Sequence, residues 1–369
     1  MQKLLSIMCV TVAAMLSANQ ATAQSVDPTA DCAILDGSNE PPNWEINTAA
    51  CSKSRTNIQA LINNSGAVNA NINNRLAPDI VSPTGITNLT AAEAAEYLNI
   101  NSSVRIVPTA DVTVSAPSPK WNLWKDVKYS WIDDNTEFSE LEGSLVNIVS
   151  GLDYKISDSV VVGIMGSYES SDREGEGFVP PTVETEGFGL GAYMGANLSS
   201  SVVFSANVMQ SWIDTDVNGG GLDAESNRTQ AAAALTGYYY SGTKRFTPSL
   251  NLAWSREVME DVAGFSPDVT FEQAVLSPGF QFGNTVALSD TVTVEPWMGA
   301  QVDWAFINTT ELDGFGTIFD APFVDLRLQA GLNFALGTRA QLGLTAEASG
   351  LLLDESDTYT VGGNFAFQF

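Results

Sequence analysis

The sequence predicts an all-β protein: a 12-stranded antiparallel transmembrane β-barrel of the outer-membrane type, preceded by a short, partly helical N-terminal segment. Three observations predict this class. From Trp121 onward, apolar residues alternate with small or polar ones at a period of two, which is the pattern of a β-strand. The alternating stretches span about 11 to 15 residues, whereas strands of globular proteins average about five to six. The links between them are short and long in turn.

The alternation of side chains is clearest in 324–334. Val324 and Leu326 begin an apolar face there, and Asp325 and Arg327 begin a polar one. Successive side chains of a strand point to opposite sides of the sheet, so each of these rows covers one face. The 12 expected strands are 121–132, 142–156, 159–169, 185–198, 201–213, 229–241, 244–256, 271–284, 290–306, 322–336, 339–351 and 358–369.

The expected connections differ in length at the two ends of the barrel. Short polar links lie at 155–159, 198–201, 241–244, 287–290 and 336–339. Long acidic links lie at 133–141, 170–184, 214–228, 257–270, 307–321 and 352–357. Tight periplasmic turns opposite longer outer loops are typical of outer-membrane barrels. The alternative is a soluble β-sandwich or lipocalin-like barrel, whose apolar faces would point inward.

The closing residues YTVGGNFAFQF place a row of aromatic rings at the end of the chain. Phe365, Phe367 and Phe369 share one face of the last expected strand. Lipid tails offer no hydrogen bonds, so a membrane-spanning sheet must close on itself and turn its apolar rows outward. We therefore expect these rings to face the bilayer, with Phe369 near the inner headgroups.

Composition excludes several classes of function. The chain carries 43 acidic against 16 basic residues, a formal net charge of −27, and no histidine. This charge disfavours nucleic acid or an anionic membrane as a partner held by electrostatic attraction. Without histidine, Ser-His-Asp and Cys-His catalysis and imidazole metal ligands are excluded. We predict no enzymatic activity, cofactor or metal, although paired carboxylates remain as possible catalytic groups.

Charged residues are expected in two places. Most acidic residues lie in the long links, where they are either solvated or bridged by divalent cations to anionic lipid heads of the outer leaflet. Charges on the strands are expected to face a wet lumen. Asp325 and Arg339 form a plausible ion pair there, on adjacent strands. The expected lumen-lining residues are Glu295, Asp303, Asp325, Arg327, Arg339 and Glu347.

The first 120 residues form two segments. Residues 1–23 have the apolar stretch and small-residue end of a signal peptide, with cleavage expected before Gln24. Residues 24–120 are a short passenger or plug with a linker; they contain expected helices at 56–76 and 90–98. Cys32 and Cys51 are expected to form a local disulfide outside the reducing cytosol, and two free thiols are the alternative.

The segments LWKDVKYSWIDDN (123–135) and GSLVNIVSGLDYKISDSVVVGIMGSYESSD (143–172) resemble the start of an autotransporter translocator domain of type V secretion. The shared features are a Trp-rich first strand with Trp121 and Trp124, the Gly151–Tyr154 strand end, and a third strand with Gly163 and Gly166. The closing GGNFAFQF is similar to the family's assembly signal. The resemblance covers 121–369.

This resemblance implies a monomeric 12-stranded barrel inserted by the outer-membrane barrel assembly machinery and surrounded by outer-membrane lipids. It also implies a pore threaded by the preceding segment and an upstream passenger displayed outside. Family passengers are usually long parallel β-helices with visible repeats. Residues 24–120 show no such repeat, so a long adhesin or protease passenger is not expected here.

Three functions remain open on the sequence. The first is a translocator that carries or displays its N-terminal segment and performs no chemistry. The second is a small pore or uptake channel with 24–120 as a plug or periplasmic cap; its acidic lining would favour cations or neutral solutes. The third, an enzyme with paired carboxylates, is disfavoured because lumen charges usually pair structurally.

Overall fold

The structure, a computed structural model, describes residues 41–77, 119–136, 139–175, 182–217, 222–260, 268–289, 291–312, 316–320, 322–353 and 356–369. These residues form a helix, α2 (Pro41–Leu76), and 15 strand segments of one sheet. The segments are β1 (Trp121–Thr136), β2 (Ser139–Ser157), β3 (Val160–Gly175), β4 (Thr182–Ser199), β5 (Val202–Val217), β6 (Leu222–Gly237), β7 (Tyr239–Ser241), β8 (Lys244–Glu260), β9 (Val269–Asn284), β10 (Val286–Ala287), β11 (Val292–Leu312), β12 (Gly316–Asp320), β13 (Phe323–Leu336), β14 (Ala340–Ser349) and β15 (Ser356–Gln368).

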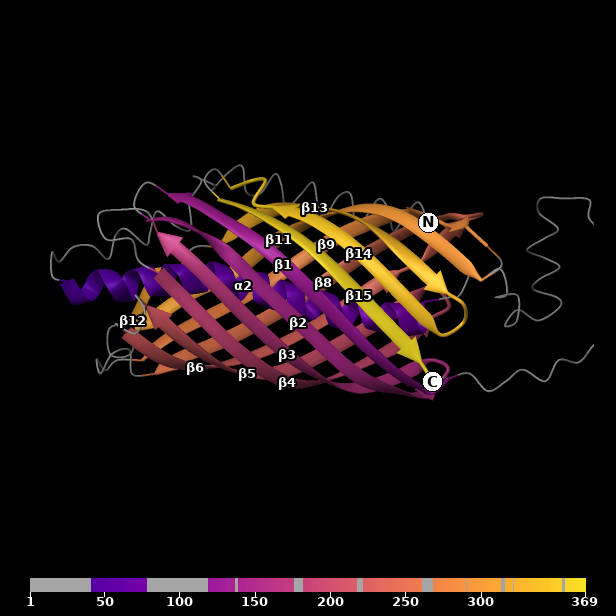
Figure 1. Cartoon of the computed structure of the whole chain (residues 1–369), viewed down its shortest axis with the longest axis horizontal. Coiled ribbons are helices and arrows are strands. Elements are labelled where there is room, and N and C mark those ends of the chain that lie inside the picture. Colours follow the sequence, from indigo (N-terminus) through magenta and orange to yellow (C-terminus); the bar gives the residue numbers. More distant parts are fainter. Residues whose placement is uncertain are drawn as a thin grey trace, which may run out of the picture.

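The sheet closes into a 12-stranded antiparallel barrel (Figure 1), which confirms the predicted fold class. Segments β7 and β10 continue β6 and β9, and β12 precedes β13, so these three short segments add no strand of their own. Strand β1 pairs with β15. At this seam Trp121 and Phe369 exchange two backbone hydrogen bonds, with N to O distances of 3.1 and 3.0 Å. Closure satisfies the backbone without a free edge, as lipid requires.

The two ends of the barrel differ. The inner end, as we call it, carries the tight turns and Phe369; the outer end is the opposite one. Gly242 and Gly337, with φ of 61° and 67°, lie in two of the inner turns, where a left-handed backbone suits glycine. Their short connections match the prediction for this end.

The strands reach further at the outer end than the sequence predicts. The link 133–141 was predicted as a loop, yet β1 and β2 stay paired as far as Thr136 opposite Ser139. The link 214–228 is likewise largely paired. The loop prediction is wrong at both places because side-chain polarity marks where the hydrocarbon ends, whereas the backbone ladder continues into water.

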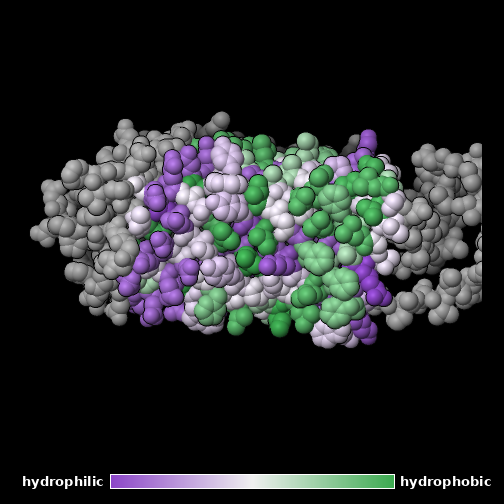
Figure 2. All heavy atoms as spheres, viewed as in Figure 1, coloured by the Kyte–Doolittle hydropathy of each residue, from purple (hydrophilic) through white to green (hydrophobic). Residues whose placement is uncertain are grey.

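The wall is apolar outside and polar inside. Ile164 and Met298 point outward with 66% and 65% of their surface exposed, whereas Asn147 and Arg228 point inward and are fully buried. Figure 2 shows the hydrophobic residues gathered toward the end where the C-terminus lies and hydrophilic residues toward the other. This distribution suits a barrel whose outer surface contacts lipid.

Helix α2 lies inside the barrel and extends beyond the strands at the outer end (Figure 1). The helix predicted at 56–76 is confirmed, and it begins earlier, at Pro41, a residue favoured in the first turn of a helix. In the described part of the chain, no helix is both long and apolar enough to cross a membrane. The helix predicted at 90–98 lies outside the described residues.

Candidate functional site

The lumen of the barrel is the candidate site, and α2 occupies it. The direction of α2 follows from its contacts: Ala60 packs with Ile132 and Leu145 toward the outer end, whereas Arg75 donates to the Lys120 carbonyl, 3.1 Å away, at the inner end. The helix therefore enters the barrel from the outer end and finishes at the inner end.

Asparagine side chains connect α2 to the wall. The Asn64 amide donates to Gln230 (3.0 Å) and accepts from Asn147 (3.1 Å). Nearer the inner end, Asn69 donates to Asn251 at 3.3 Å. Asparagine is a weak helix former, but here its amide satisfies polar groups that a buried apolar helix would leave unpaired.

A buried polar cluster fixes the inner end of α2. Its centre is Asp153 of β2, which forms an ion pair with Arg75 at 3.0 Å. Asp153 also accepts hydrogen bonds from Asn71 (3.0 Å), Asn122 (2.8 Å) and Tyr193 (3.0 Å). A buried carboxylate with a cation and three donors is well satisfied, so this cluster can hold the helix against the wall.

Two glycines of the family-like motif support aromatic rings around this cluster. Trp124 lies over Gly151, and Tyr193 lies over Gly163; in each case a Cβ on the glycine would run into the ring. The indole N–H of Trp124 donates to the Tyr193 hydroxyl at 2.6 Å. The motif residues are therefore adjacent in space. Their role in supporting the two rings could not be predicted from their spacing in the sequence.

A second buried cluster contacts α2 at Asn57, nearer the outer end of the barrel. Arg228 of β6 donates to Glu169 and Glu257, both at 2.8 Å, and to the side chain of Asn57 on α2. These side chains are buried, so the two carboxylates and the amide together compensate the desolvated guanidinium. Sequence reasoning missed this cluster because its members come from four elements far apart in the chain.

Five of the six residues expected to line the lumen lie on inward rows. Arg327 bridges Asp303 and Glu347, each at 2.8 Å, and Glu295 pairs with Arg245 at 2.7 Å. The fifth, Asp325, accepts the backbone N–H of Gly350, 2.7 Å away.

Arg339 does not belong with them. It is exposed in the turn between β13 and β14, at the inner end, while Asp325 lies toward the outer end. The predicted ion pair of Asp325 with Arg339 is therefore wrong: in a hairpin, residues pair at equal distances from the turn, and Arg339 is inside the turn.

The expected assembly signal lies on the outer wall beside the seam. Phe365, Phe367 and Phe369 are 45%, 39% and 53% exposed, and Phe365 and Phe367 lie opposite Lys125 and Leu123 of β1. Their role in assembly stays a prediction. The expected Cys32–Cys51 disulfide and the signal segment 1–23 lie outside the residues whose side chains are described.

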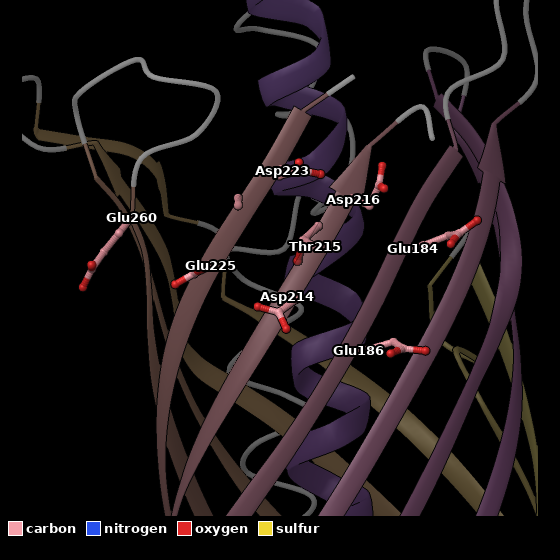
Figure 3. A pocket seen from close by; sticks show the side chains of 9 residues that line it. Glu184, Glu186, Asp214, Thr215, Asp216, Asp223, Glu225 and Glu260 are labelled. Carbon is pink, nitrogen blue, oxygen red and sulfur yellow. The ribbon is translucent and has the colours of Figure 1, made fainter. Parts of the chain in front are cut away.

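Acidic residues gather on the outward face near the outer end (Figure 3). They stand in two rows across β4, β5, β6 and β8, and we call these rows the acidic collar. These residues line an open hollow. The first row is Glu184, Asp216 and Asp223, and the second row is Glu186, Asp214, Glu225 and Glu260. Nowhere in the described ranges do three or more acidic, cysteine or histidine side chains converge as a metal site would require.

The fold and the occupied lumen define a membrane-spanning barrel with a helix threaded through it. The family model described as the autotransporter beta-domain matches residues 123–348. The chain belongs to this family, whose barrels lie in the outer membrane. No curated relative matches the sequence.

Solved structures agree on the fold. The chain is similar to the beta domain of the Bordetella autotransporter BrkA, with a TM-score of 0.55 and 14% identity over 68% of this chain and 100% of that one. It is also similar to the translocator domain of NalP from Neisseria meningitidis, with a TM-score of 0.52 and 10% identity over 87% and 99%. The transport unit of AIDA-I from Escherichia coli gives a TM-score of 0.51 and 10% identity over 75% and 98%.

Proposed function

We propose that this barrel carries the chain ahead of α2 through the outer membrane and displays it at the cell surface, without chemistry of its own. The direction of α2 carries the proposal. The helix has 36 residues, and at 1.5 Å per residue it is about 54 Å long, more than the roughly 30 Å of bilayer hydrocarbon. Its two ends therefore belong to opposite sides of the membrane.

The connections at the inner end support the same topology. Ala77, after the end of α2, and Lys120, before β1, both lie at the inner end, where Arg75 contacts the Lys120 carbonyl. The described chain thus ends at Ala77 and resumes before Lys120 at the periplasmic side, whereas Pro41 lies at the outer side. Export by the signal peptide 1–23 and insertion by the assembly machinery, with Phe365, Phe367 and Phe369 as the signal, complete the proposal.

Two epitope insertions test this topology in whole cells. One is placed after Asp36 and the other after Asn99, so that each lies on a different side of α2. We expect an antibody or added protease to reach the first epitope on intact cells and the second only after the outer membrane is permeabilised. Protection of the first epitope on intact cells would contradict display.

A plugged pore is the second candidate, because the lumen without α2 would be lined by polar groups that now bind the helix. Deletion of 24–120 gives its test in planar bilayers. A steady open conductance in the deleted barrel, absent from the full chain, would favour a plug; the epitope experiment would still decide where the N-terminal segment resides. In either case we propose a monomer in contact with outer-membrane lipids, because a closed single-chain barrel needs no partner subunit.

A further inference from the structure

The helix does not fill the lumen evenly. Side chains of α2 form hydrogen bonds with β1, β2, β4, β5, β6 and β8. Its apolar side packs against β1–β5 and against Ala366 of β15. Many of the inward side chains there are sealed from solvent: Asn122 and Asn147 are fully buried, and Gln230 is 2% exposed.

The facing part of the wall, formed by β11, β13, β14 and β15, is different. Trp297, Gln329, Asn333, Gln341 and Asn364 point inward in the half nearest the inner end, and all remain partly exposed. Lipid cannot reach inward positions of a closed barrel. Their exposed surface therefore faces water inside the lumen.

The same part of the wall is closed toward the outer end. Asp303, Asp325 and Arg327 are at most 6% exposed, and Arg327 bridges Asp303 to Glu347. The side chain of Gln59 on α2 in turn interacts with Glu347. These polar side chains thus connect the wall to the helix on the outer side of the exposed positions.

We propose that a water-filled vestibule lies beside α2, open at the inner end, and that Arg327 with Asp303 and Glu347 forms the barrier between it and the outer end. Its lining is polar and includes Glu295, which is partly exposed. Such a lining suits water and small cations.

The proposal is independent of display, because it concerns the interior of the folded barrel and not the side on which a segment resides. Cysteine labelling tests it directly. In a full-length background with Cys9, Cys32 and Cys51 replaced by serine, Gln329→Cys and Gln230→Cys form a matched pair of inward glutamines. The reagent is a trimethylammonium methanethiosulfonate applied to protein folded in detergent.

We expect the Gln329→Cys thiol to react at least tenfold faster than the Gln230→Cys thiol. Equal rates, or an unreactive thiol at 329, would overturn the vestibule. Heat-modifiable mobility on gels shows whether each variant is folded. If either variant does not fold, Asn333→Cys and Asn147→Cys provide a second matched pair for the same comparison.

Conductance tests the barrier. Arg327→Gln removes the cation from the bridge, whereas Arg327→Lys keeps one. In planar bilayers with potassium chloride we expect the glutamine variant to conduct severalfold more than the lysine variant and the original chain, with cation selectivity. Slow labelling at position 230 in the Arg327→Gln background would show that α2 has stayed in place. Equal conductance in all three proteins, or rapid labelling at 230, would overturn the assignment of the barrier.

Discussion

Replacement of Arg75 by leucine should release the inner end of α2 from the wall while the barrel stays closed. Arg75 is the cation paired with the buried carboxylate of Asp153 at 3.0 Å. Removing one partner of a buried ion pair costs about 3–5 kcal/mol, because the other charge stays buried and uncompensated. Three neutral donors still contact Asp153, so we expect the lower value, about 3 kcal/mol.

Hydrogen exchange of the peptide 56–76 in the folded barrel measures this loss as local opening of the helix. Since about 1.4 kcal/mol corresponds to a factor of ten, a loss of about 3 kcal/mol should speed exchange about 150-fold. Amides of β2 and β3 should keep their protection, because the strand ladder does not depend on Arg75.

Two further variants decide whether the pair is the cause. Arg75→Leu combined with Asp153→Asn removes the uncompensated charge, so the loss should be smaller than the sum of the single losses by about 1–3 kcal/mol. Lys155→Leu removes a partly exposed cation from β2, the strand that carries Asp153, and should leave hydrogen exchange of the helix unchanged. Strict additivity in the double variant, or unchanged protection in Arg75→Leu, would refute the reasoning.

Three other predictions concern the wall. Gly163→Ala should destabilise the barrel by about 1–3 kcal/mol, because the new methyl group meets the Tyr193 ring, whereas Gly166→Ala on the same strand finds only ordinary contacts. Unfolding in detergent compares the two variants, and equal stability would contradict the close packing of Tyr193 over Gly163. Glu225→Lys turns two repulsive cross-strand carboxylate pairs into attractive ones and should stabilise by roughly 0.5–2 kcal/mol at low salt, an effect that high salt should remove. Ile164→Arg places a cation on the lipid face and should cost up to about 4 kcal/mol in a bilayer; no loss there would contradict the assigned orientation.

The barrel could be predicted from the sequence because its wall repeats one local rule. Rows such as Val324 and Leu326 against Asp325 and Arg327 fix both the strand and the face that meets lipid. The outer strand ends could not be predicted in this way. The composition of 133–141 is typical of a loop, yet hydrogen bonds between β1 and β2 hold 133–136 and 139–141 as strand.

The contacts of the lumen were far less predictable. Arg327 was expected to line the lumen, but its partner Asp303 is 24 residues away in the chain, and the adjacency depends on the register of β11 against β13. The helix was visible as a weak pattern around Leu61 and Ile72, without a sign of where it resides. Only a narrow apolar row of α2, with Val68 and Ile72, packs against the wall, and the rest of the helix is polar, so the polar interior of the barrel is needed to explain how the helix is held.

Strand number links the occupied lumen to the vestibule. A barrel of about eight strands is just filled by its own side chains, whereas about 16 strands leave a wide channel. A 12-stranded wall lies between these limits, so side chains alone leave a gap that one helix, about 10 Å across, can enter without filling. The helix therefore lies against one part of the wall. The polar anchors at Arg75 and Arg228 hold it against the wall of β1–β6 and β8, and the remaining space falls beside β11–β15, where Gln329 and Asn333 stay wet.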